Sequence, residues 1–238
     1  MLDHPTTERI LAELGAERIV ETLAPYLSEH RRERIEAALR GRVSGVHVAV
    51  EEPYDPHNAA AVVRSVEAFG AAGVHVIRAS ERVLASRRTT QGAFHWVERG
   101  SFAALEEFFA AMHQRGLRVY GGAMDGELTL DGLPVVAPIC LLFGNEHRGL
   151  SAAARARCDG LYRIPMFGFS ESLNLSVSAA VSLYDVLRRR RAHVGRDSDL
   201  EPEEYRVERA RCYLRAVDPR FAVGLVAQTK RSGPVDSP

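Results

Sequence analysis

The sequence has little cysteine, a single lysine and no net charge, and each of these features excludes a class of protein. The three cysteines Cys140, Cys158 and Cys212 are odd in number and far apart, so they form neither a disulfide framework nor a Cys-x-x-Cys metal pair. We expect them to be ordinary buried thiols. A formal net charge of zero argues against nucleic-acid binding through overall charge alone.

Long hydrophobic runs and a secretion signal are also lacking. No stretch approaches the roughly 18 uninterrupted apolar residues that a membrane span needs, and the residues after Met1 lack the basic-then-apolar order of a signal peptide. The 238 residues, 46% of them hydrophobic, are enough to bury a full core. We therefore expect a cytoplasmic globular protein with no membrane contact.

Positive charge comes almost entirely from arginine, because Lys230 is the only lysine. The arginines are concentrated in two segments, Arg31 to Arg42 and Arg188 to Arg196. Such clusters are either phosphate-binding surfaces or solvated helix faces, and the sequence leaves both interpretations open. The candidates for RNA binding are Arg32, Arg34, Arg188 and Arg190.

The pattern of apolar residues divides the chain into three segments. Residues 1–43 show helical spacing, residues 44–192 alternate short β-rich runs with helical stretches, and residues 193–238 read as one more helix and a tail. The alternation predicts an α/β fold with a mostly parallel sheet flanked by helices. The expected strands are Val46–Val50, Val74–Ile77, Phe94–Val97, Leu117–Tyr120, Ile139–Phe143 and Leu161–Ile164.

Ligands of open α/β sheets bind at the carboxyl ends of the strands, so the loops there are the place to look for a site. One such loop runs from Asp55 to Asn58 into a helix that carries Arg64. Asn58 is either a helix cap or a functional amide. Arg64 lies in an otherwise apolar turn, so its guanidinium is either paired in the core or free to bind an anion.

Two more loops contain polar residues in unusual arrangements. The loop after Phe143 places two glycines around Asn145 and Glu146, which suits either close approach to a ligand or a simple turn capped by Ser151. It is not a phosphate-binding P-loop, because the required Lys-Ser/Thr pair is missing. The loop after Ile164 leads into a helix whose first turns are small and polar, which allows a cofactor to lie against them.

Together the three loops resemble the three signature motifs of the SPOUT 2′-O-ribose methyltransferases, in the order that the family has them. Asn58 to Arg64 matches N-x(5)-R, Gly144 to Gly149 matches G-N/A-E-x-x-G, and Ile164 to Val177 matches I-P-x(6)-S-L-N-x-S-V. The sequence is most similar to the tRNA (guanosine-2′-O) methyltransferase branch of the family, called TrmH or SpoU. The resemblance extends from about Val46 to Arg191.

This resemblance implies a deep trefoil knot, a homodimer, and S-adenosylmethionine bound by backbone groups in the knot. It implies methylation of a ribose 2′-hydroxyl in structured RNA, with a tRNA D-loop guanosine as the expected target. The implied catalytic residues are Arg64, Asn58, Glu146, Ser172 and Asn174. The implied cofactor-binding residues are Gly122, Gly144, Ile164 and Leu173. Because an arginine is a poor base at neutral pH, we expect Arg64 to clamp a phosphate and stabilise the alkoxide rather than take its proton.

Three alternatives remain at this stage. A ribosomal RNA methyltransferase of the same family would share the motifs, and a catalytically silent RNA-binding protein would share the fold. A nucleotide-binding oxidoreductase is disfavoured because no G-x-G-x-x-G follows the first strand. The spacing of the nine histidines implies no metal, since they form no His-x-x-x-His or His-x-Glu pair.

Overall fold

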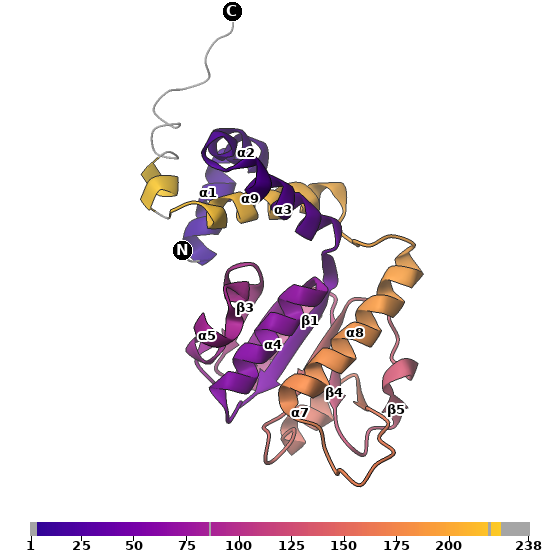
Figure 1. Cartoon of the computed structure of the whole chain (residues 1–238). Helices are drawn as coiled ribbons and strands as arrows, with labels where there is room; N and C mark the ends of the chain where they lie inside the picture. Colours follow the sequence, from indigo (N-terminus) through magenta and orange to yellow (C-terminus); the bar gives the residue numbers. More distant parts are fainter. Residues whose placement is uncertain (1–3, 86, 219, 225–238) are drawn as a thin grey trace, which may run out of the picture. The chain divides into compact units, whose positions relative to one another are not determined.

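The computed structural model describes residues 4–85, 87–218 and 220–224 and divides the chain into two compact units. One unit combines Met1–Gly41 with Leu200–Pro238, and the other comprises Arg42–Asp199. The sequence suggested separate extensions at the two termini, whereas the helices of both extensions belong to the same unit (Figure 1).

The larger unit is built on a seven-stranded sheet in the order β3-β2-β1-β6-β4-β7-β5. Every neighbouring pair of strands is parallel, which confirms the predicted α/β class. The strands are β1 (Val43–Glu51), β2 (Ala71–Ile77), β3 (Glu98–Phe102), β4 (Arg118–Gly122), β5 (Leu128–Thr129), β6 (Ile139–Phe143) and β7 (Gly160–Arg163). The trefoil knot does not follow from strand order alone and stays a prediction.

Helices cover both faces of this sheet, as expected for parallel strands that are apolar on both sides. Successive residues of a strand face opposite sides, so Val48 and Val50 of β1 join one core cluster while Ala49 joins the other. The first cluster contains residues of α4 and α8, which pack side by side (Figure 1), and the second contains residues of α6 and α7. The helices of this unit are α4 (Pro56–Phe69), α5 (Arg87–Thr90), α6 (Leu105–Gln114), α7 (Ala152–Arg157) and α8 (Leu175–Val194), with short 3-10 turns η2 (Glu81–Leu84), η3 (Ala93–His95) and η4 (Leu130–Gly132).

The smaller unit is helical and is closed by the C-terminal helix. Arg211 donates to both carboxylate oxygens of Glu8 at 2.9 and 2.8 Å, and the Tyr205 hydroxyl donates to Glu36. Residues far apart in sequence therefore share one small core. The elements are α1 (His4–Leu14), α2 (Ala16–Leu23), η1 (Ala24–Tyr26), α3 (Glu29–Arg40) and α9 (Pro202–Ala216).

The expected strand Phe94–Val97 was wrong. Those residues form η3 and the turn after it, and the strand is β3, a few residues later at Glu98–Phe102. Because β3 lies at an edge of the sheet, it pairs with β2 alone and needs no long apolar run to fill two buried faces. Pattern analysis therefore placed the strand on the more apolar residues before it.

Two exclusions made from the sequence can be compared with the structure. All three cysteines are free, with Cys140 and Cys212 buried and Cys158 partly exposed. None of the helices in the described residues is both long enough and apolar enough to span a membrane.

Candidate active site

Side chains from all three motif loops form one hydrogen-bonded chain. Asn174 donates through Nδ2 to Oδ1 of Asn58 at 3.0 Å, and Asn58 donates through Nδ2 to Oε1 of Glu146 at 3.1 Å. We call these three residues the amide clasp. They come from the amino ends of α8 and α4 and from the loop after β6, so the clasp joins segments separated by 88 and 116 residues.

Glu146 is the residue of the amide clasp that backbone hydrogen bonds hold in place. Its Oε2 accepts the backbone N–H of Tyr54 at 2.7 Å, and its Oε1 accepts that of Asp55 at 3.2 Å. Partial burial acts to raise the pKa of Glu146, but these N–H donors and the Asn58 amide outweigh it and lower the pKa below its ordinary value. Glu146 is therefore an ionised acceptor that orients Asn58, and it holds no proton to exchange at neutral pH.

The helix caps explain why the clasp asparagines are placed as they are. The cap of α4 is Asp55, whose side chain accepts from the His57 N–H at 2.8 Å, so Asn58 is not the N-cap and its amide is available to the clasp. Asn174 does cap α8, because its Oδ1 accepts from the N–H and the hydroxyl of Ser176. Its amide nitrogen points instead to Asn58.

The loop from Gly144 to Gly149 is folded tightly on itself. Asn145 and Gly149 exchange two backbone hydrogen bonds of 3.1 and 2.8 Å. A Cβ added to Gly144 would lie 2.0 Å from the carbonyl carbon of Gly149 and 2.1 Å from the Leu150 nitrogen. This glycine is therefore required by the loop's own backbone, so the tight turn by itself is enough to explain it.

Three of the residues predicted to bind the cofactor lie at the carboxyl ends of neighbouring strands. Gly122 ends β4, Gly144 follows β6 and Ile164 follows β7, and these three strands are neighbours in the order β6-β4-β7. Leu173 precedes the clasp residue Asn174 and is 38% exposed. The carboxyl ends of three adjacent strands thus present backbone groups to one region, which suits a ligand held mainly by main-chain contacts.

Arg64 and Ser172 do not take part in the clasp. Arg64 is exposed, and no hydrogen bond or ion pair joins it to the residues that the structure describes. On α4 it follows Asn58 by six residues, which places it about 9 Å further along the axis and about 120° around it. Ser172 is exposed in the loop before α8. Arg64 is thus available to an anion, but on another face of α4.

The arginine cluster on α8 is mainly structural, and the prediction that Arg190 binds RNA was wrong. Arg190 is 8% exposed and donates to Asp199 at 3.2 Å and to the carbonyls of Val135 and Val136. Asp199 also accepts from the backbone of Ser44 and Gly45, so this pair joins the end of α8 to the start of β1. The other three predicted RNA contacts, Arg188, Arg32 and Arg34, are exposed.

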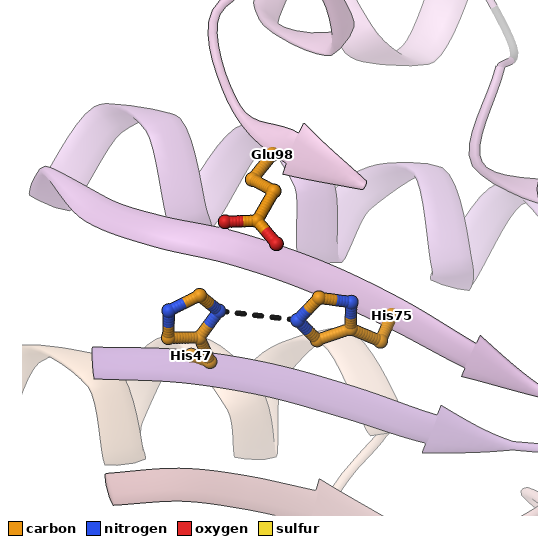
Figure 2. A group of neighbouring side chains, drawn as sticks. All are labelled: His47, His75 and Glu98. Atoms are coloured by element: carbon orange, nitrogen blue, oxygen red, sulfur yellow. Dashed lines mark hydrogen bonds between the residues drawn. The ribbon is translucent and has the colours of Figure 1, made fainter. Parts of the chain in front are cut away.

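The fold also assembles a polar group that sequence spacing did not reveal. His47 on β1, His75 on β2 and Glu98 on β3 lie on adjacent strands with ligand atoms within 4.8 Å of one another (Figure 2). Arg115 donates to both oxygens of Glu98 at 2.6 and 2.8 Å. We call these four residues the histidine relay. The one available signal was the repeated Gly-Val-His-Val, in which a histidine interrupts an apolar strand at residues 45–48 and 73–76.

The rings of His47 and His75 meet edge to edge. Their planes differ by 12°, and their centroids are 5.3 Å apart (Figure 2). This separation equals the 3.1 Å between the facing nitrogens plus about one ring radius on each side, so the rings lie side by side in nearly the same plane. One of the two nitrogens therefore donates its N–H to the lone pair of the other. Ligands of one tetrahedral metal ion would instead converge on a point away from that line.

The relay has one consistent proton arrangement. Arg115 can only donate, so Nε2 of His47, at 3.4 Å, is the acceptor and Nδ1 of His47 carries the hydrogen. That hydrogen goes to Nε2 of His75, which leaves the Nδ1–H of His75 buried and without a partner among the residues that the structure describes. Burial lowers the pKa of His47 to about 3 and that of His75 to about 4, so both rings are neutral.

Comparison with known proteins decides the family to which this arrangement belongs. Residues 45–184 match the model of the SpoU rRNA methylase family, a span that includes all three motifs. The chain belongs to the SpoU methylase family. The tRNA (guanosine(18)-2′-O)-methyltransferase of Thermus thermophilus is 35% identical over 180 residues, which cover 75% of this chain and 93% of that protein. The predicted family, fold class and enzyme class are thereby confirmed.

Two solved structures of SpoU methylases match as well. The TrmH/SpoU tRNA modifying enzyme of A. aeolicus aligns with a TM-score of 0.66 over 84% of this chain and 97% of its own, at 23% identity, and this likeness concerns the fold. The SpoU methyltransferase AviRb of Streptomyces viridochromogenes, in complex with AdoMet, aligns with a TM-score of 0.57 at 28% identity, over 65% of this chain and 61% of its own. S-adenosylmethionine is therefore the cofactor of this SpoU methylase, as predicted.

Proposed function

We propose that this SpoU methylase transfers a methyl group to the ribose 2′-hydroxyl of a guanosine in the D-loop of tRNA. The observation that carries the proposal is the amide clasp, in which residues from all three motifs are linked by hydrogen bonds. The similarity to the guanosine-specific Thermus enzyme covers three quarters of the chain and supports tRNA as the substrate.

Each residue of the site has a task that its position supports. S-adenosylmethionine, when bound, supplies the electrophilic methyl group, and Gly122, Gly144, Ile164 and Leu173 would hold it at the carboxyl edge of the sheet. Arg64 clamps a substrate phosphate and stabilises the alkoxide that develops as the 2′-hydroxyl proton passes to solvent water. An asparagine amide has two N–H donors, and within the described residues Asn58 and Asn174 use one each. The remaining donors, with Ser172, position the ribose or its phosphate.

We further propose that the enzyme is a homodimer and that a second chain completes the site. Val177, Val181 and Tyr184 form an exposed stripe on α8, 46%, 39% and 60% exposed respectively, whereas Val186 is buried on the opposite side. Arg64 lies too far around α4 to act beside Asn58 of its own chain, which favours action across an interface. Light scattering at micromolar concentration should report a dimer, and Val181→Asp should shift it to monomer with loss of activity.

The test of the substrate is direct. The purified protein is incubated with S-adenosylmethionine and either tRNA or ribosomal RNA, and 2′-O-methyl groups are mapped by mass spectrometry. We expect one methylated guanosine in tRNA, and no product when that guanosine is replaced by 2′-deoxyguanosine. Methylation of ribosomal RNA alone would replace the tRNA proposal with the ribosomal one. Methylation of neither RNA, with cofactor bound, would identify a silent RNA-binding protein.

A further inference from the structure

Two exposed rings lie just outside the amide clasp, and the proposed chemistry leaves them without a role. Tyr54 precedes the first motif and His147 follows the clasp residue Glu146 directly. Their ring centroids are 4.4 Å apart and their planes differ by 78°, so the edge of one ring meets the face of the other. The side chain of Tyr54 is 68% exposed.

Both residues are held firmly by their backbones. The Tyr54 N–H donates to Glu146 at 2.7 Å, and the His147 N–H donates to Oδ1 of Asn145 at 3.0 Å. Asn145 is itself anchored, because its Nδ2 donates to the carbonyl of Glu52 at 2.7 Å. The two rings therefore stand at nearly right angles on fixed backbones and are open to solvent. They form a preorganised corner, which a flat aromatic molecule can enter with little loss of side-chain conformational entropy.

The position of this corner indicates what occupies it. Tyr54 is joined by one hydrogen bond to the carboxylate that orients Asn58, so the corner adjoins the place where the target ribose is expected. Arg148 lies next to His147 with its side chain 71% exposed and its charge partly balanced by Glu52 at 2.7 Å. An aromatic face beside a guanidinium is the usual combination for an unpaired nucleotide, which offers a base to stack and a phosphate to pair.

We propose that Tyr54 and His147 form a stacking platform for an unpaired nucleobase of the RNA, next to the ribose that is methylated. This inference rests on the proposed function and adds to it a determinant of substrate choice. The platform requires a base displaced from a helix, so the enzyme should favour a target in a loop over the same nucleotide in a duplex.

The test compares substitutions at Tyr54 in the full-length protein. Stacking on an aromatic side chain contributes about 1–3 kcal/mol per base, so Tyr54→Ala should raise KM for tRNA by about 5- to 150-fold. Tyr54→Phe keeps the ring and should stay near the wild-type KM. Tyr54→Leu keeps apolar bulk but has no π-face, so it should resemble Tyr54→Ala. Calorimetry should give an unchanged affinity for S-adenosylmethionine in all three variants.

Tyr26 provides a matched control. It is 54% exposed, lies in the other compact unit and makes the same kind of edge contact with Phe221, with centroids 4.7 Å apart and planes at 76°. Tyr26→Ala should leave KM unchanged. If Tyr54→Leu has the wild-type KM, or if Tyr54→Ala weakens cofactor binding or converts a dimer to monomer, the platform is overturned while the proposed function stands. A wild-type protein that methylates no RNA would overturn both.

Discussion

The loops at the carboxyl ends of the strands and the interior of the larger unit handle polar groups in opposite ways. At the carboxyl ends of the strands, the residues of the amide clasp are partly or fully exposed and keep hydrogen-bonding capacity to spare. In the interior, His47 and His75 are buried in the middle of β1 and β2, and the Arg190–Asp199 pair is buried beside the start of β1. Polar groups therefore serve binding where they are accessible and structure where they are buried.

The strongest test of this comparison is a substitution of the buried Arg190. Removing one partner of a buried ion pair costs about 3–5 kcal/mol, because the other charge is left buried and unpaired. Arg190→Ala should therefore lower the free energy of urea unfolding by that amount, while activity per folded molecule is retained. Arg188→Ala, two residues away and exposed, should change it by less than about 0.5 kcal/mol. Equal effects of the two substitutions would remove the distinction.

The opposite behaviour is expected of the exposed Arg64. Arg64→Ala should lower kcat by about 10²- to 10³-fold, the usual cost of losing an electrostatic stabiliser, with unfolding free energy and cofactor affinity unchanged. Arg64→Lys keeps the charge but loses the planar fork. Substantial activity of the lysine variant would show that a point charge is sufficient and that the phosphate clamp is incorrect.

Glu146 tests whether the clasp acts by orientation. Glu146→Gln replaces an oxygen that accepts hydrogen bonds with an amide nitrogen that donates them, and a hydrogen bond to a charged group contributes about 1.5–3 kcal/mol. We expect kcat to fall about 10- to 100-fold, measured at saturating RNA. The exposed Glu127 serves as control, and Glu127→Gln should be neutral. A general base would give a pH–rate profile whose acid limb disappears in the glutamine variant, contrary to our assignment.

Most of this arrangement could be predicted from the sequence, and the failures have physical causes. The apolar runs of β1 and β6 identified the central strands, and the three motifs named every clasp residue. The backbone donors at Tyr54 and Asp55 could not be predicted, because they meet Glu146 only after the chain has folded across some ninety residues. The edge strand β3 lacked the apolar run that makes a strand recognisable.

The prediction for Arg190 failed for a different reason, because the sequence did contain the pattern that indicates its burial. Leu183, Val186, Leu187 and Arg190 follow the i, i+3, i+4, i+7 spacing of one buried helix face. Arg188 instead continues the exposed stripe that contains Val181 and Tyr184. A run of arginines was interpreted by its composition, whereas its helical phase determined which members reach solvent.

The histidine relay predicts a dependence of stability on pH. Unfolded histidines take up protons near pH 6.5, whereas His47 and His75 in the fold stay neutral until about pH 3 and 4. Between these values the unfolded chain binds more protons, so the free energy of unfolding should fall as pH decreases, by up to roughly 1.4 kcal/mol per pH unit for each histidine. His75→Gln should flatten this slope between pH 6.5 and 5 in urea titrations, and the exposed His193→Gln should not.

The smallest expected effect concerns Arg32 and Arg34, which are exposed on α3 of the helical unit. If they contact RNA phosphates, each should release counterions on binding, and losing one contact should reduce the slope of log affinity against log salt by about 0.7–0.9. The double variant Arg32→Ala/Arg34→Ala should therefore bind tRNA more weakly at low salt and converge with wild type as salt rises, with kcat at saturating RNA unchanged. Filter binding at four salt concentrations measures this slope. Parallel lines for the variant and wild type would assign both arginines to a solvated helix face.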